Sequence, residues 1–173
     1  EAALKNGASI VNDITALLGD KRMREVVSRY KASVILMHMR GTPRSMQKNI
    51  KYKSLIADMI EELRKSINLA KEAGIEDDKI IVDPGIGFGK TPENNIEILR
   101  RLSEFSVLKK PILIGTSRKS FIGKILGKNE SERLFGTIAT VVIGITNGAS
   151  IVRVHDVLEV KDAVTVTDRI LKA

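Results

Sequence analysis

The sequence predicts a parallel α/β barrel, and two features of the chain lead to that prediction. Five short runs rich in Ile and Val alternate with helical segments, and each run is apolar on both faces, as parallel strands buried on both sides are. Polar residues end every run, whereas an open doubly wound sheet would gather them at one switch point. A complete TIM (β/α)8 barrel takes about 250 residues. The 173 residues are therefore expected to form a single domain, residues 1–173, that supplies the fourth to eighth βα units of such a barrel.

The five predicted strands occupy residues 9–14, 33–39, 79–85, 111–117 and 150–156. Because parallel strands of a barrel all end at one rim, the polar residues at their C-terminal ends are expected to lie near one another. These residues are Asn12, Asp13, His38, Asp83, Thr116, Ser117, Arg153, His155 and Asp156. The sequence therefore predicts a functional site at that rim.

Three helical segments separate the strands. Residues 54–74 place Leu55, Met59, Leu63 and Ile67 at helical spacing, as the core side of a helix, and end at Gly74. Residues 94–105 are predicted to begin with Asn94 as the N-cap, and residues 132–149, the most apolar segment, are expected to pack tightly on the sheet. The first nine residues have the pattern of the last turns of a helix, with Asn6 and Gly7 as its end.

Composition narrows the classes of partner. The net charge of +8 suits an anionic ligand or nucleic acid, although the charge count alone favours charge spread over solvated helix faces. Two Tyr, four Phe and no Trp offer no row of stacking platforms, which argues against single-stranded nucleic acid. The absence of Cys excludes disulfides and thiolate metal sites. With no membrane-length apolar run and no signal peptide, the chain is expected to be cytoplasmic.

Arg153 and His155 are the first candidate pair. Side chains alternate along a strand, so these two residues point the same way at a strand end, where they are suited to hold a phosphate-type anion. The alternative is that Arg153 pairs with a nearby carboxylate, Asp156 or Asp83.

The glycine-rich loop at 83–91 is the second candidate. Three glycines let the backbone approach a ligand closely, and Phe88 is suited to form the wall of a site for a flat molecule. Asp83 with Asn12 matches a heteroaromatic edge that carries N–H donors, because one carboxylate binds a guanidine-like edge with two hydrogen bonds. A packed loop with a buried Phe, and an Asn12 that satisfies backbone groups, remain the alternatives. The spacing of a phosphate-binding loop is not kept at 85–91.

Residues 35–47 supply less. Met37 shares a strand face with Ile35 and is expected as an apolar contact at the barrel mouth. His38 is a lone histidine at a strand end with no predicted catalytic role, and Arg40 is expected on an exposed loop.

Six motifs in this order resemble the dihydropteroate synthase family along essentially the whole chain. They are IVNDI, MHMRGTPRSMQ, DPGIGFGKT, GTSRKSFIG, ER-x2-GT at 132–137 and RVHDV. The resemblance implies a TIM barrel that joins 6-hydroxymethyl-7,8-dihydropterin pyrophosphate to p-aminobenzoate, giving 7,8-dihydropteroate and releasing pyrophosphate with the help of Mg²⁺. SRKSFIG and RVHDV are the specific motifs. Asn94 stands where many relatives have His, outside the site.

The resemblance also implies a role for individual residues. The pterin would be bound by Asn12, Met37, Asp83, Phe88, Gly115, Lys119 and Arg153. Lys119 would also reach the p-aminobenzoate, whose carboxylate would sit on Ser120 and the free N–H groups of the next helix. Arg118 is the less certain cation of this motif and is expected either near the site or facing outward, paired with an acidic neighbour.

Catalysis is implied for Lys119, Arg153 and His155, the last two holding the departing pyrophosphate together with Mg²⁺. The electron-rich pterin supports a cationic methylene, which the neutral aniline nitrogen attacks without a general base. No metal ligand is expected in this chain, because the family's Mg²⁺-binding Asn, a pterin-binding Asp and two mobile loops belong to its first three strands. An N-terminal complement and a homodimer are accordingly expected as partners, with no nucleic acid and no membrane.

Two other functions remain as alternatives. A methyltetrahydrofolate-dependent methyltransferase shares recognition of the pterin edge but releases no pyrophosphate. An inactive fragment or basic scaffold would bind nucleic acid with an affinity that falls steeply with salt. Because five barrel strands leave two open edges and an uncovered apolar interior, the chain alone is expected to aggregate, to swap, or to need its complement.

Overall fold

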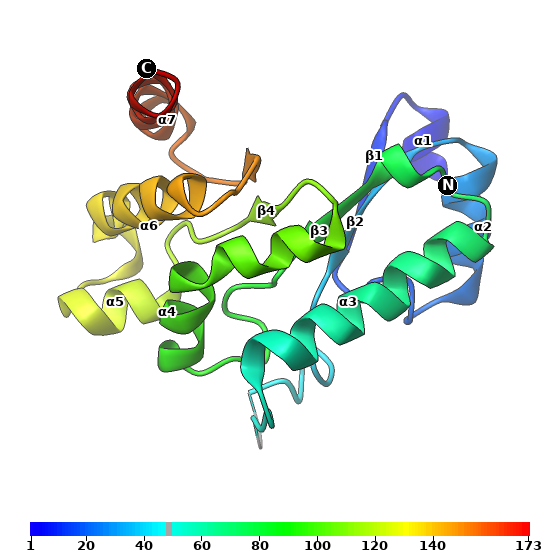
Figure 1. Cartoon of the computed structure of the whole chain (residues 1–173), viewed down its shortest axis with the longest axis horizontal. Coiled ribbons are helices and arrows are strands. Elements are labelled where there is room, and N and C mark those ends of the chain that lie inside the picture. Colours follow the sequence, from blue (N-terminus) through cyan, green and yellow to red (C-terminus); the bar gives the residue numbers. More distant parts are fainter. Residues whose placement is uncertain (48–49) are drawn as a thin grey trace.

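The computed structural model describes residues 1–47 and 50–173 as one curved layer of parallel strands with helices along its outer side (Figure 1). The strands are β1 (Ile10–Asp13), β2 (Ser33–Met37), β3 (Ile80–Asp83), β4 (Leu113–Ile114) and β5 (Ile151–Val152). The pairs β1–β2, β2–β3 and β4–β5 are parallel, and a parallel bridge between Val82 and Ile112 joins β3 to β4. The strands therefore follow one another in space in the order in which they occur along the chain, as they do in a barrel.

The helices alternate with these strands. They are α1 (Ala2–Lys5), α2 (Lys21–Arg29), α3 (Leu55–Glu72), α4 (Pro92–Arg100), α5 (Ser120–Leu126), α6 (Leu134–Thr146) and α7 (Val157–Leu171), with short 3₁₀ helices at Asp77–Lys79, Leu102–Leu108 and Glu130–Glu132. Figure 1 shows α3 and α4 running along one side of the strands. Among the described residues, no helix has both the length and the apolar content that crossing a membrane requires.

The two faces of the strands carry two different hydrophobic clusters. Side chains such as Val34, Leu36 and Val82 join the large core between the strands and the helices. The alternate positions form a small inner cluster of Ile35, Ile81 and Leu113, against which Ile151 packs. Because side chains alternate between the two faces of a strand, the residue two positions after each of these also faces the inside of the barrel. Those next positions are Met37, Asp83, Gly115 and Arg153.

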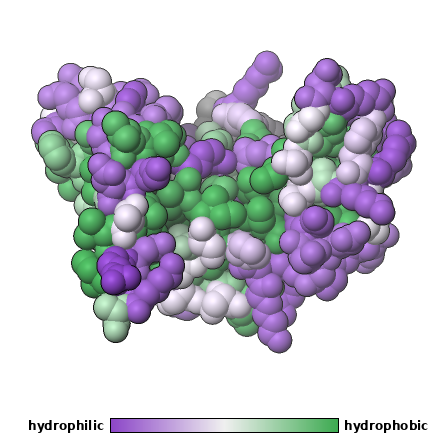
Figure 2. All heavy atoms as spheres, turned by 90° about the horizontal axis from the view of Figure 1, so that it is seen from above, coloured by the Kyte–Doolittle hydropathy of each residue, from purple (hydrophilic) through white to green (hydrophobic). Residues whose placement is uncertain are grey.

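The inner side of the layer is open. Figure 2 shows hydrophobic residues gathered across the middle of this view, between two mostly hydrophilic ends. Ile10, in the edge strand β1, is 50% exposed. A groove of about 520 Å³ runs along β5 and α7, lined mainly by aliphatic side chains.

The prediction for residues 54–74 is confirmed. Helix α3 spans Leu55–Glu72, and its four predicted core residues, Leu55, Met59, Leu63 and Ile67, are all buried. Ala73 is the C-cap of this helix, and Gly74 follows it with a positive φ of 82°, the conformation that commonly ends a helix.

The start and end of the next predicted helix were wrong. Helix α4 begins at Pro92, and Thr91 rather than Asn94 is its N-cap. The Thr91 hydroxyl accepts from the Asn94 N–H at 3.1 Å, while the Asn94 side-chain oxygen accepts from the Thr91 N–H at 3.1 Å. This reciprocal pair fixes the first turn three residues earlier than predicted. The chain then continues as a 3₁₀ helix over Leu102–Leu108.

Two strands and one helix also differ from prediction. Strands β4 and β5 have two residues each, because Pro111 has no N–H to donate and β5 pairs with β4 alone among the described strands. Helix α6 was expected to pack tightly over its length, yet only Thr137, Val141 and Gly144 are buried, and Phe135 is 78% exposed. Apolar composition alone therefore overestimated how much of this helix the chain covers.

Candidate active site

Most of the predicted site residues meet in one pocket at the C-terminal ends of the strands. This hollow, called the rim pocket below, has a volume of about 340 Å³. Its lining is Asn12, Ile14, Phe88, Gly115, Ser117, Lys119, Arg153, Val154 and His155. The lining residues come from β1 and from the segments after β3, β4 and β5, so the pocket depends on the parallel order of the strands.

Arg153 connects the two residues that were predicted to bind a heteroaromatic edge. Its Nη1 donates to Asn12 Oδ1 at 3.1 Å, and its Nη2 donates to Asp83 Oδ2 at 3.3 Å. The pairing with Asp83 was one of the alternatives for Arg153, so this guanidinium is both in the pocket and ion-paired. Asn12 is exposed, which leaves its side chain accessible from the open side.

Asp83 is held rigidly at the end of β3. It is 1% exposed, and its Oδ1 accepts from the Gly85 N–H at 2.7 Å. Gly85 has a positive φ of 67°, the conformation that turns this N–H back toward the carboxylate. Burial raises the pKa of Asp83, against the opposing effects of the Gly85 hydrogen bond and the charges of Arg153, Lys90 and Lys119. A ligand with N–H donors would stabilise the ionised form of Asp83, as Arg153 does.

Phe88 and Lys119 form one wall of the pocket. The Lys119 ammonium lies 4.3 Å from the centre of the Phe88 ring, a cation–π arrangement. Phe88 is half-buried, so the alternative of a fully buried Phe lid does not describe it. Burial lowers the pKa of Lys119, and the charge of Arg153 lowers it further. The pocket therefore combines an aromatic face with a cation that an anionic ligand would stabilise.

Two side-chain contacts join the segment that follows β4 to the segment that follows β5. Ser117 Oγ is 2.8 Å from His155 Nδ1, and the His155 N–H donates to the same oxygen at 3.1 Å. Arg118 turns outward and pairs with Asp156, with Nε 3.2 Å from Oδ2. Of the two positions open to Arg118, the structure has the outward one.

Three predicted site residues do not line the rim pocket: Asp83, which borders it through Arg153, Met37 and Ser120. Met37 is 1% exposed and packs beneath Gly85, where it supports the glycine-rich loop from inside the barrel. Ser120 is the exposed first residue of α5, and it stands beside the pocket next to Lys119. Their proposed contacts with the two substrates remain predictions.

Behind the glycine-rich loop lies a buried polar cluster that the sequence did not reveal. Lys90 is 3% exposed, and its Nζ donates to Phe88 O at 2.8 Å and His38 O at 3.2 Å and lies 3.1 Å from His38 Nδ1. His38 Nε2 is 3.0 Å from Glu62 Oε2. Lys90 therefore ties the loop that carries Phe88 to the end of β2. A lysine in a glycine-rich loop resembles a solvent-exposed residue in sequence, and nothing in the local pattern marks it as buried.

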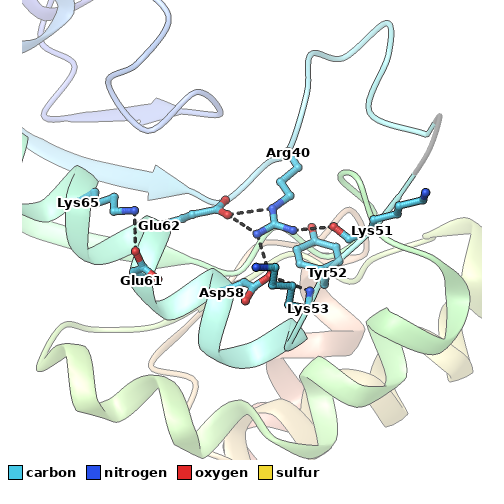
Figure 3. A pocket seen from close by; sticks show the side chains of 8 residues that line it. All are labelled: Arg40, Lys51, Tyr52, Lys53, Asp58, Glu61, Glu62 and Lys65. Carbon is cyan, nitrogen blue, oxygen red and sulfur yellow. Dashed lines mark hydrogen bonds and ion pairs between the residues drawn. The ribbon is translucent and has the colours of Figure 1, made fainter.

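Glu62 and Arg40 continue this cluster to the surface (Figure 3). Arg40 was expected on an exposed loop, but it forms ion pairs with Glu62 and Asp58 and stacks on the Tyr52 ring at 4.1 Å. Burial opposes the ionisation of Glu62, yet hydrogen bonds from His38 and Arg40 lower its pKa to about 2. The hollow beside these residues, about 490 Å³, is larger than the rim pocket. Because six of the predicted site residues line the rim pocket and none of them lines this hollow, we regard the rim pocket as the site.

The titration of Lys90 gives a testable expectation. Burial lowers its pKa from the model-compound value of 10.5 to about 7. Between about pH 7 and pH 10.5, Lys90 is protonated in the unfolded chain and neutral in the folded chain. The unfolded chain therefore binds one more proton, and rising pH favours folding. The free energy of unfolding of the wild type, relative to Lys90→Met, should therefore increase from pH 7 toward pH 10, by at most about 1.4 kcal/mol per pH unit. Urea unfolding of both proteins at several pH values measures this difference, and a difference independent of pH would contradict it.

The curved parallel layer and its rim pocket define the chain as a large part of an α/β barrel, with its candidate site at the C-terminal ends of the strands. A family profile described as pterin binding enzyme matches residues 1–155, and the chain belongs to that family. This assignment confirms the family and the fold that the six motifs predicted.

Individual relatives agree with the family assignment. The chain is 46% identical to a dihydropteroate synthase of Clostridium beijerinckii over an alignment 173 residues long, which covers 99% of this chain and 62% of that protein. A crystal structure of dihydropteroate synthase from Clostridium difficile in the presence of pteroic acid superimposes with a TM-score of 0.93 at 45% identity, over 99% of this chain and 63% of that one. The enzyme of Thermus thermophilus in complex with 6HMPPP gives a TM-score of 0.92 at 34% identity, over 98% and 67%. The chain thus spans a little over three-fifths of the length of these relatives.

Proposed function

We propose that this chain is the C-terminal part of a dihydropteroate synthase, a transferase of folate biosynthesis. The observation that carries the proposal is the joining of Asn12 and Asp83 by Arg153 beside the Phe88–Lys119 wall. A flat heteroaromatic ligand with a pyrophosphate group needs an acceptor pair, an aromatic face and cations within one pocket, and the rim pocket has all three. Residues 1–173 act in this proposal as a single domain.

The pterin edge would bind Asp83 and Asn12. A carboxylate held by Gly85 on one oxygen keeps its second oxygen turned toward the pocket, where a guanidine-like edge can donate to it. Phe88 covers the ring system, with Gly115 and Met37 completing its surroundings. The geometry explains why Gly115 carries no side chain, because a Cβ there would meet Arg153 Nη2 at 2.9 Å.

The reaction would use Arg153, His155 and Lys119. As the bond between the methylene carbon and the pyrophosphate oxygen breaks, charge grows on pyrophosphate, and Arg153 and His155 stabilise it. The aniline nitrogen of p-aminobenzoate then forms the new C–N bond and loses a proton to solvent or to the pyrophosphate. Lys119 and Ser120 would hold the p-aminobenzoate carboxylate at the start of α5.

Mg²⁺ belongs to this proposal through the family resemblance alone. Among the described residues, no group of three or more His, Asp or Glu side chains could hold a metal ion. Asp83, the carboxylate beside the rim pocket, is bonded to Gly85 and Arg153. Residues 1–47 and 50–173 therefore show no set of ligands for Mg²⁺, and we assign the ion no step here.

The proposed partner is an N-terminal segment that completes the barrel. Its first strand would pair along β5, over the groove lined by side chains such as Ile151, Val154 and Val157. A homodimer and a cytoplasmic location are parts of the same proposal. The chain together with this segment is called the full-length protein below.

The intact mass of everything in a purified sample, under denaturing conditions, tests the proposal first. A second chain of about 90–110 residues, the size of three missing units, or a single longer chain is the expected result. Pyrophosphate release should then require both the dihydropterin pyrophosphate and p-aminobenzoate. A sample of full mass that binds neither substrate would contradict the proposal, and one that instead transfers methyl groups to a corrinoid would favour the methyltransferase.

The 173-residue chain alone provides the matching expectation. Without the complement it should be inactive and prone to association, because its inner apolar face and two strand edges are uncovered. Size-exclusion chromatography with light scattering, followed by thermal melting, measures this. A monodisperse monomer that melts cooperatively would refute the need for a complement.

A further inference from the structure

We propose that Ser117 is a positioning residue that holds the neutral His155 ring in its Nε2–H tautomer, so that His155 presents a hydrogen-bond donor to a phosphate oxygen. This inference deepens the proposed function and rests on it for the identity of the ligand. The resemblance to the family assigned Ser117 no role. Its effect would pass through His155, since its hydroxyl contacts the ring and the main chain of that residue.

The first step is the geometry of the two loops. Ser117 follows β4, is 5% exposed, and lies opposite His155, which follows β5. Its Oγ receives the His155 backbone N–H at 3.1 Å and lies 2.8 Å from His155 Nδ1. One hydroxyl thus contacts both the main chain and the ring of the same residue, which fixes the ring against the loop.

The second step is to account for the protons. A serine hydroxyl has one proton to donate and two lone pairs, and one lone pair already accepts the His155 N–H. If Nδ1 carried the ring proton, it would donate to the second lone pair, and the hydroxyl proton would have no acceptor among the described residues. The arrangement that gives this proton an acceptor has the hydroxyl donating to Nδ1 and the ring proton on Nε2.

The third step is the direction of the remaining donor. With Nδ1 occupied by Ser117, Nε2–H is the ring's one free polar group, and His155 lines the rim pocket with Arg153 and Lys119. A donor there meets a phosphate oxygen favourably, whereas the other tautomer would present a lone pair to a negatively charged group. Held in this tautomer, the His155 ring presents an N–H donor to the anion beside the charge of Arg153.

The ion pair of Arg118 with Asp156 stabilises the contact between Ser117 and His155. Asp156, the residue after His155, is the nearest carboxylate in sequence that could compete for the ring nitrogen. It is held by Arg118, with Nε 3.2 Å from Oδ2, and the Arg118 N–H donates to Thr137 Oγ1 at 3.1 Å. The two loops are thus joined twice, once by Ser117 and His155 and once by Arg118 and Asp156.

The tautomer can be measured without reference to activity. Long-range ¹H–¹⁵N correlation spectra of the full-length protein, labelled at histidine, separate the protonated from the unprotonated ring nitrogen. This chain has two histidines, and a His155→Gln variant assigns the signals of His155. We expect an unprotonated Nδ1 and a protonated Nε2 in the wild type, a mixture in Ser117→Ala, and the wild-type pattern in Ser117→Thr. A wild-type ring with its proton on Nδ1, or an unchanged tautomer in Ser117→Ala, would overturn the inference.

Kinetics then distinguish positioning from a general structural role. Ser117→Ala should lower kcat/KM for the dihydropterin pyrophosphate about tenfold, the loss of about one hydrogen bond, while KM for p-aminobenzoate stays unchanged. Ser117→Thr should restore most of the loss. Ser66→Ala, which removes a 2% exposed hydroxyl on α3 outside the pocket, is the matched control and should leave both constants unchanged. If the full-length protein has no synthase activity but shows the expected tautomers, the proposed function fails and the role of Ser117 stands. If it is active and Ser117→Ala matches the control, the role of Ser117 fails.

Discussion

Replacing Arg153 with Met should lower kcat/KM of the full-length protein for the dihydropterin pyrophosphate by about 10²–10³-fold, the range found when one stabiliser of transition-state charge is removed. Two effects combine in this variant. The departing pyrophosphate loses its guanidinium, and Asp83, 1% exposed, loses the cation that lies 3.3 Å from its Oδ2. Burial already raises the pKa of Asp83, so removal of Arg153 should raise it further and weaken binding of the pterin edge.

Two further variants separate these effects. Arg153→Lys keeps a charge but loses the fork that reaches Asn12 and Asp83 together, so it should fall between the wild type and Arg153→Met. Arg101→Met removes a guanidinium that pairs with Glu97 and Glu104 on the outer surface, and it should leave the kinetics unchanged. Steady-state rates of pyrophosphate release measure all three. If Arg153→Met stays within about threefold of the wild type, below one hydrogen bond in free energy, Arg153 does not hold pyrophosphate.

The parts of the fold that could be predicted depend on patterns that are local in sequence. The continuous apolar runs of β2 and β3 identified strands buried on both faces, and the helical spacing of α3 identified its core residues. The cap of α4 was wrong because Thr91, Pro92 and Asn94 are all compatible with a helix start, and only the reciprocal hydrogen bonds decide among them. The burial of α6 was overestimated because composition does not reveal which chain segment covers Phe135.

Some residues of the site could also be predicted from the sequence, and others could not. Residues at strand ends could be predicted to meet, since the topology of a parallel barrel brings those ends together, and Arg153, Asp83 and His155 are of this kind. Lys90 could not be predicted there, and for Ser117 only the position at the rim was predicted, because the roles of both come from contacts with segments far away in sequence. Lys90 contacts His38, and Ser117 contacts His155. A polar residue that acts through a distant partner leaves no local signal.

Replacing Gly85 with Ala should be the most destabilising of the substitutions considered, with a loss of about 3 kcal/mol or more in the free energy of unfolding. A Cβ at this position would run into the backbone oxygen of His38, and the Cγ of Met37 lies 3.3 Å away. The oxygen belongs to the main chain at the end of β2, which is held by the His38 N–H bond to Asp83 O at 2.8 Å and by Lys90. Because neither side can move freely, the loop must shift, and Asp83 then loses the Gly85 N–H that fixes its carboxylate.

Gly127→Ala is the matched control for this effect. Gly127 has almost the same backbone conformation, φ 65° against 67°, but a Cβ there would meet nothing within 4 Å. It should therefore cost only the strain of a left-handed alanine, about 1–2 kcal/mol, and the difference between the two variants isolates the collision with β2. Urea unfolding, on the form of the protein that the mass measurement identifies, gives both values. Equal losses would mean that β2 and the glycine-rich loop adjust to each other easily. The rigid placement of Asp83, on which recognition of the pterin edge depends, would then have to come from Arg153 alone.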